Sequence, residues 1–182
     1  YKILVVIMAV CVMQTQMVSQ SFKVHKGDTV NYVDKNNHKQ GRWIVFEGNT
    51  EKVLQEGHYT GDLKEGIWTS YYSTGNKKSE ISYLSGQKKG FAKIYFENGK
   101  LKEQNSYLEG EKHGIWFTYF ETGVKNAEAN YRHNKKDGIW RIWDEKGKLR
   151  YEMYYSNGEK IGTWRIWDEQ GKLTFERNYS LN

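Results

Sequence analysis

The sequence predicts an all-β protein, an elongated antiparallel β-meander built from tandem β-hairpins of about 24 residues each. Five glycines recur at a constant spacing of 24 residues: Gly66, Gly90, Gly114, Gly138 and Gly162. Each is followed by two short runs rich in aromatic and β-branched residues, joined by a second glycine, which is the pattern of a β-hairpin. Helical periodicity is absent after residue 20. We therefore expect one array, not several globular domains.

The first 19 residues have the layout of a secretory signal peptide. An unbroken apolar run covers residues 3–13, follows Lys2, and is too short to span a bilayer as a helix. We expect cleavage after Ser19 and therefore an exported protein, located in the periplasm, the cell envelope or the extracellular space. Cys11 is the only cysteine and lies in this segment, so the mature chain is expected to contain no disulfide.

Residues 20–40 are predicted to form an N-terminal lead-in with one cap strand at 29–33, followed by a turn at 34–38. The remaining residues, 41–182, are predicted to form six tandem hairpins. These start near residues 41, 66, 90, 114, 138 and 162. The first unit contains one extra residue, which we place in its hairpin loop around residues 48–50.

Tryptophan and tyrosine occupy fixed positions in the units. A tryptophan follows the first glycine by two residues, and a tyrosine ends the second run. The predicted structural positions are the five glycines above together with Trp68, Trp116, Trp140, Trp164, Tyr83, Tyr107, Tyr131, Tyr155 and Tyr179. Ala92 replaces the tryptophan once. We expect these rings to form most of the thin apolar face of the sheet.

Two turn types remain open for the loop inside each hairpin. Asn98-Gly99 favours a two-residue type I′ turn, whereas 144–147 and 168–171 also suit a type I turn closed by a glycine bulge. A two-residue loop places Trp140 and Leu149 on the same, core face of the sheet. The connections between hairpins, such as 85–90, are expected to be longer and polar.

An even register also predicts charged pairs between neighbouring hairpins. The pairs are Glu80 with Lys93, Glu128 with Arg141, and Glu152 with Arg165. Where Gln104 replaces the glutamate, its predicted partner is Phe117, so both charges are lost together. Such exposed pairs contribute only about 0.2–1 kcal/mol each, so we expect them to fix the register more than the stability.

The sequence contains no recognisable catalytic constellation. The five histidines are scattered and lack the spacing of a zinc site, and the glycines do not form a nucleotide-binding motif. A glutamate that recurs in nearly every unit is expected to serve the repeat, not acid–base catalysis. We therefore expect a protein that is not an enzyme and needs no cofactor or metal.

The pattern Gly-x-Trp-x-x-Tyr, turn glycine, Leu-x-x-Glu-x-x-Tyr-x-x-Gly resembles the MORN-repeat variant, over about residues 32 to 182. Proteins with this repeat include the bacterial YwqK-type antitoxin family. The resemblance implies an antiparallel β-meander with roles in binding partners or membranes. This chain departs from the pattern at Ala92, Gln104 and Asn134.

These features predict an exported, non-enzymatic repeat protein that binds another protein. The alternatives are a glycan- or anionic-lipid-binding module of the cell envelope and an antitoxin that neutralises a partner toxin. The tryptophan rows and the basic turns at 87–89 and 134–136 favour the first alternative. The recurring glutamates count against nucleic acid. The last strand, 173–179, is expected to offer an edge for self-association or for addition of a partner strand.

Overall fold

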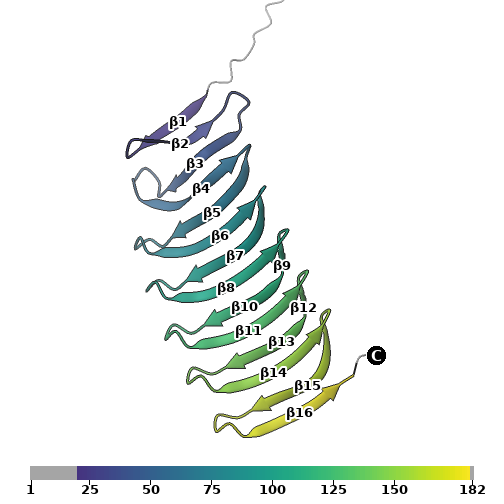
Figure 1. Ribbon diagram of the computed structural model, residues 1–182. Helices are drawn as coiled ribbons and strands as arrows, with labels where there is room; N and C mark the ends of the chain where they lie inside the picture. The colour runs from purple at the N-terminus through teal and green to yellow at the C-terminus, as the bar shows by residue number, and fades with distance from the viewer. Residues whose placement is uncertain (1–19, 181–182) are drawn as a thin grey trace, which may run out of the picture.

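The computed structural model describes residues 20–180, so the expected signal peptide lies outside the described residues. The described chain forms one antiparallel sheet of 16 strands, in which successive strands are neighbours. Figure 1 shows the strands stacked along one long axis, with turns along both edges and no second layer over either face of residues 20–180. The all-β meander predicted from the sequence is confirmed.

The strands are of similar length along the array, apart from two short segments. The first eight are β1 (Ser21–His25), β2 (Asp28–Val33), β3 (Lys39–Phe46), β4 (Val53–Thr60), β5 (Leu63–Tyr71), β6 (Lys77–Leu84), β7 (Gln87–Tyr95) and β8 (Leu101–Leu108). The others are β9 (Glu111–Lys112), β10 (Gly114–Tyr119), β11 (Lys125–Arg132), β12 (Lys135–Lys136), β13 (Gly138–Trp143), β14 (Leu149–Ser156), β15 (Glu159–Trp167) and β16 (Leu173–Tyr179). The short β9 and β12 pair with β8 and β11.

The lead-in contains two strands, not the single strand that the sequence predicts. β2 includes the expected residues 29–33, and β1 pairs with it in an additional hairpin. Asn31 has a φ of 56° inside β2. Its side-chain oxygen accepts the backbone N–H of Ile44 at 2.6 Å, and its amide donates to the Ile44 carbonyl at 2.8 Å. The Asn31 side chain thus pairs with β3 at a point where the backbone of β2 turns away.

The loop inside each of the five hairpins from β5–β6 to β15–β16 is a type I turn followed by a glycine bulge. The Gly99 N–H donates to the Phe96 carbonyl at 2.9 Å, and the Phe96 N–H donates to the Lys100 carbonyl at 2.8 Å. Gly99 has a φ of 83°, whereas Asn98 does not adopt a positive φ. A type I′ turn requires positive φ at both central residues. The two-residue turn expected at Asn98-Gly99 is therefore wrong, and the bulged alternative is correct.

The two-residue turns lie at the opposite edge of the sheet, between the hairpins. Leu84 pairs with Gln87, and the two residues between them, Ser85 and Gly86, have φ of 49° and 80°. The same left-handed pair recurs between the other hairpins at 61–62, 109–110, 133–134 and 157–158, and it also forms the loop inside the β1–β2 hairpin at 26–27. These are type I′ geometries. The long polar connections expected between hairpins are therefore wrong, because the strands continue almost to the turn.

Compared with the expected two-residue loop, the bulged loop moves only the first residues that follow it to the other face of the sheet. Trp140 pairs with Met153, and Ile142 pairs with Tyr151, so these side chains share one face as expected. Leu149 instead pairs with Trp143, because the register shifts between Ile142 and Trp143. The placement of Leu149 on the core face is therefore wrong. The tryptophan face also carries the buried residues Trp68, Ala92, Ala129 and Tyr155.

The recurring glycine lies at a bend in the strand that follows each two-residue turn. Gly66 has a φ of 66°, and a Cβ added there would meet no atom within 4 Å. The β4–β5 register shifts at this point, between Glu56 and His58. The requirement at position 66 is therefore for a left-handed backbone conformation and not for lack of space.

Replacing Gly66 with alanine should lower the free energy of unfolding by about 1–2 kcal/mol, the cost of a left-handed conformation for an L-residue. Urea denaturation followed by circular dichroism measures the loss. Gly66→Asn is the matched control and should lose less, because asparagine tolerates this conformation. Equal stability of the wild type and both variants would contradict the assigned role of the bend.

Candidate binding surface

One face of the sheet carries an aromatic ladder, which we define as Trp43, Tyr59, Trp68, Tyr83, Tyr107, Trp116, Tyr131, Trp140, Tyr155, Trp164 and Tyr179. From Tyr107 to Tyr179 the rings follow one another without a break, with centroids 5.1–5.5 Å apart. Their planes are tilted or perpendicular, an arrangement that aromatic quadrupoles favour. The ladder joins the hairpins to one another along the axis of the array.

Each tryptophan of the recurring position also anchors the preceding strand through its indole N–H. Trp116 donates to the Ser106 carbonyl at 3.0 Å, and Trp68, Trp140 and Trp164 make the equivalent bond at 3.0–3.1 Å. The Trp68 ring lies against Gly57, where an added Cβ would be 2.3 Å from the indole. Trp68 is consequently only 2% exposed. The indoles therefore have a structural role in the sheet.

The ladder is interrupted at the one unit that lacks tryptophan. Ala92 is 2% exposed and pairs with Asn105, which is 4% exposed. The Asn105 amide donates to Glu103 at 3.2 Å, but its oxygen has no hydrogen-bond partner among residues 20–180. A buried carbonyl oxygen without a donor costs free energy, so this unit is the least well satisfied part of the ladder.

A row of lysines lies over the aromatic ladder. The lysine row consists of Lys39, Lys64, Lys88, Lys112, Lys136 and Lys160, each two residues before the recurring glycine. Their ammonium nitrogens are 4.2–5.4 Å from the centroids of tryptophan or tyrosine rings. This is cation–π geometry. All except Lys160 are half-buried.

Backbone hydrogen bonds hold the lysine row in place. The Gly86 N–H donates to the Lys64 carbonyl at 2.9 Å, and Gly110 donates in the same way to Lys88. Equivalent bonds from later turns reach Lys112 and Lys136. The five two-residue turns between hairpins are thus each bonded to the lysine of the preceding unit, which accounts for every member of the row except Lys160. The spacing of the row therefore follows the spacing of the strands.

The ammonium groups of the row have no carboxylate within ion-pair distance among the described residues. The pKa of Lys64 is lowered from its ordinary value, first by burial and then by repulsion from Lys39 and Lys88. Neighbouring members of the row therefore interact electrostatically. The sequence prediction did not identify this row, although the sequence contains a lysine two residues before the recurring glycine of every unit.

The opposite face carries the predicted cross-strand charges. The register sets Glu80 opposite Lys93, Glu128 opposite Arg141, Glu152 opposite Arg165, and Gln104 opposite Phe117. The ion pairs themselves differ. Glu80 and Glu128 each pair with the lysine three residues earlier in the same strand, at 2.6 and 3.1 Å. Glu152 reaches Arg165 at 3.6 Å and the nearer Arg141 at 2.9 Å.

Two tyrosines that end their strands, Tyr71 and Tyr95, donate their hydroxyls to recurring glutamates on this face. Tyr71 donates to Glu56 at 2.6 Å, and Tyr95 donates to Glu80. Burial is the first cause that raises the pKa of each tyrosine to about 12, and the carboxylate is the second. The pKa of Glu56 is lowered, with the Tyr71 hydroxyl as the first cause.

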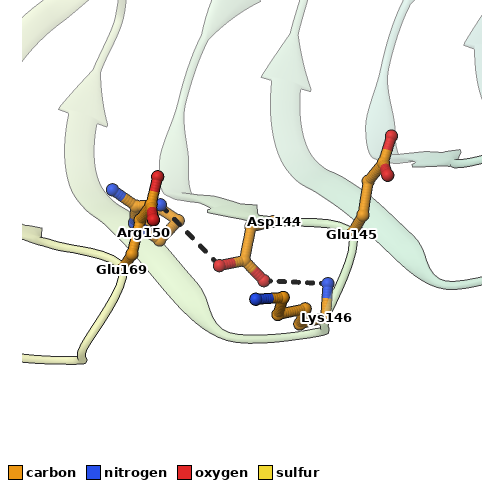
Figure 2. A pocket seen from close by; sticks show the side chains of 5 residues that line it. All are labelled: Asp144, Glu145, Lys146, Arg150 and Glu169. Carbon is orange, nitrogen blue, oxygen red and sulfur yellow. Dashed lines mark hydrogen bonds and ion pairs between the residues drawn. The ribbon is translucent and has the colours of Figure 1, made fainter.

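Side-chain clusters outside the two faces are occupied by structural bonds. Figure 2 shows a depression at the bulged-turn edge, lined by Asp144, Glu145, Lys146, Arg150 and Glu169. Asp144 accepts the backbone N–H groups of Lys146 and Lys148 at 3.0 and 2.9 Å and lies 3.7 Å from Arg150. The Lys148 N–H is the first cause that lowers the pKa of Asp144. This carboxylate therefore caps its own turn, and Glu145 points away from it in Figure 2.

The histidines do not form a metal site in the described part of the chain. The rings of His113 and His133 lie 5.3 Å apart, and His133 Nδ1 is 2.7 Å from Glu111. Within residues 20–180, no group of three or more histidine, cysteine, aspartate or glutamate residues has an arrangement suited to a metal ion. The same residues include no helix with the length and apolar character needed to cross a membrane.

Comparison with known proteins agrees with this repeat geometry. A model of the MORN repeat variant family matches more than half of the chain, at residues 64–84, 90–109, 112–133, 136–157 and 160–180. No curated protein matches the chain. Each matched segment coincides with one hairpin, from β5–β6 to β15–β16. The hairpin β3–β4, the first of the six predicted units, is not matched, although its register shifts after Val45 as in the later hairpins.

A double-mutant cycle tests the contact between the lysine row and the aromatic ladder. Lys136→Met combined with Trp140→Leu should give a coupling free energy of about 0.5–1 kcal/mol, the usual size of an exposed cation–π interaction. Chemical denaturation of the four proteins measures it. Lys135, an exposed neighbour, is the control, and its cycle with Trp140 should give no coupling. Equal coupling in both cycles would contradict a specific contact.

The raised pKa values predict a loss of stability in strong alkali. A tyrosine whose pKa is raised by folding stabilises the protein below the unfolded pKa of about 10. This contribution is lost as the pH rises towards about 12, where Tyr71 and Tyr95 ionise. Tyrosinate absorbance should show a phase near that pH that shrinks in Tyr71→Phe and Tyr95→Phe. Glu80→Gln should move part of this phase to lower pH, and unchanged curves would contradict the assignment.

Proposed function

The chain belongs to the MORN repeat variant family, and we propose that it is an exported, non-catalytic scaffold that binds another protein along its open sheet. MORN repeats generally mediate interactions with proteins or membranes and are not catalytic. The observation that supports the proposal most directly is the repeated, uncovered sheet surface. The same groups recur at every hairpin over the described length, on a sheet with no second layer.

Such a surface suits an extended partner better than a small substrate. Each hairpin contacts its neighbours in the stack, so the surface grows by one identical unit per repeat. The carboxylates of Asp144 and Glu152 are engaged in a turn cap and in ion pairs, respectively. The apolar side chains of Ile67, Phe91 and Ile115 are exposed at equivalent positions of three successive hairpins. A recurring exposed apolar row is typical of interaction surfaces.

The export part of the proposal is supported by the apolar segment at residues 3–13 and its preceding lysine. The lysine row favours one alternative function, which is binding to an anionic lipid or a glycan. Stacking of sugars on the aromatic ladder is less well supported, because lysines and neighbouring rings already lie against the tryptophans. Neutralisation of a toxin is a special case of protein binding, and co-expression with neighbouring genes tests it.

Affinity capture with a shortened array tests the proposal. The full chain, immobilised and exposed to a cell-envelope extract, should enrich a defined protein. Deleting one unit, residues 138–161, should leave a folded array, because the flanking hairpins keep equivalent neighbours. The shortened array should bind the captured protein more weakly, since it offers less surface to an extended partner.

An unrelated basic β-protein of similar size serves as the background control for the capture. Circular dichroism and thermal melting establish that the shortened array is folded. The proposal of protein binding would be refuted if the chain enriches no protein more than the control does. If the chain also floats with anionic vesicles, lipid binding is its function instead.

A further inference from the structure

The lysine row has a fixed spacing. Consecutive members lie on strands separated by one intervening strand, for example Lys64 on β5 and Lys88 on β7. Neighbouring strands are about 4.7–4.9 Å apart, so consecutive lysines are about 9.4–9.8 Å apart along the array. The bonds from the turns to the lysine carbonyls hold this spacing, and the rings hold the ammonium groups.

The row is also electrostatically incomplete. Six ammonium groups follow one another on one face, and no carboxylate of the described residues pairs with them. Neighbouring charges on the row repel one another, and a bound anion between or above them would relieve that repulsion. The row therefore complements a ligand with a negative charge at every 9–10 Å or so.

An extended polypeptide in the polyproline II conformation has this repeat. It rises about 3.1 Å per residue with three residues per turn, so the same face returns every ~9.3 Å. A β-strand presents one face every ~6.6–6.8 Å and does not match the row. Grooves lined by aromatic residues commonly bind polyproline II segments, and the rings beside the lysines provide such a lining.

We propose that the lysine row binds an acidic polypeptide segment in the polyproline II conformation, with a carboxylate at every third residue. This inference rests on the proposed function, since it names the chemistry of the protein partner. Each carboxylate meets one ammonium group, and the residues between them lie over the half-buried rings of the ladder, such as Trp116 and Trp140. The aromatic rings hold the ammonium groups before binding, so less side-chain entropy is lost on association.

A membrane or an acidic polysaccharide is a different occupant of the same row. Mobile lipid headgroups have no repeat of their own and gain nothing from fixed spacing between the lysines. The regular spacing and the ordered ammonium groups favour a ligand with a regular repeat. The aromatic lining favours a peptide over a polysaccharide, because the lysines already cover ring faces on which sugars would stack.

Two peptides of equal composition test the spacing. The first is (Glu-Pro-Pro)6, with a carboxylate at every third residue, and the second is (Glu-Pro)6 followed by six prolines. Fluorescence anisotropy with labelled peptide and the full chain should show clearly tighter binding of the first peptide. The affinity should fall as salt is added. Equal affinity for both peptides, or no binding of either, would overturn the proposal.

Substitutions in the row provide the second measurement. The triple variant Lys64→Gln, Lys112→Gln, Lys136→Gln should weaken binding of (Glu-Pro-Pro)6 by about tenfold, from three exposed charge pairs. The matched control, Lys35→Gln, Lys146→Gln, Lys172→Gln, removes the same charge from exposed lysines outside the row and should bind nearly as wild type. Arginine at the same three positions should preserve binding of (Glu-Pro-Pro)6. This result would show that the weaker binding of the glutamine variant is due to lost charge and not to misfolding.

The outcomes separate this inference from the proposed function. A protein captured from the envelope extract whose binding is insensitive to the triple variant would refute the role of the row and leave the scaffold function intact. The peptide ligand would be refuted if (Glu-Pro-Pro)6 does not bind while anionic vesicles or a polyuronate bind through the row. Protein capture is the separate measurement on which the scaffold function depends.

Discussion

The bend at the recurring glycine is the constraint on which the rest of the sheet depends. It shifts the pairing between neighbouring hairpins, as between Glu56 and His58, and brings the next indole against the preceding strand. The Ser106 carbonyl then accepts both the backbone N–H of His113, at 3.1 Å, and the indole of Trp116. The backbone conformation, the ring position and the lysine above the ring are therefore set at one place in each hairpin.

A sheet with no second layer in its described part has to bury its apolar surface along its own face. Few side chains of the described residues are buried, among them Ile44, Trp68 and Ala129. The rings of the ladder cover one another, and the lysine ammonium groups lie over the rings. This explains how a chain with a mean hydropathy of −0.87 forms an extended ordered array. Stability is distributed along the stack and is not concentrated in one core.

The period of the repeat was predictable because glycine, tryptophan and tyrosine recur at positions that the fold requires. The two turn types were exchanged in the prediction for a physical reason. A type I′ turn and a type I turn with a bulge both place glycine at the last loop position, so Asn98-Gly99 suits either. Three of the actual type I′ turns begin with Ser85, Glu109 or His133 in a left-handed conformation, and these residues do not signal such a turn. The turn at Asn157-Gly158 does carry the Asn-Gly signal, which the prediction did not use.

The surface was less predictable than the fold. The register opposite Glu128 follows from the spacing, but its ion pair with Lys125 depends on side-chain rotamers. The lysine row was missed because lysine and arginine together account for 28 residues, and a periodic lysine is easily taken for a solvated surface. Strand β1 was missed because its sequence has neither the aromatic nor the glycine positions of the repeat.

The interruption at Ala92 divides the array mechanically. In a linear array, stability is the sum of the repeats and the couplings between neighbours. The coupling across β6, β7 and β8 lacks an indole bond and contains the unpartnered oxygen of Asn105. The aromatic contacts therefore form two separate runs, from Trp43 to Trp68 and from Tyr107 to Tyr179, on either side of this unit. We expect bending of the array to concentrate at this unit, which would change the curvature of the long surface while both aromatic runs stay intact.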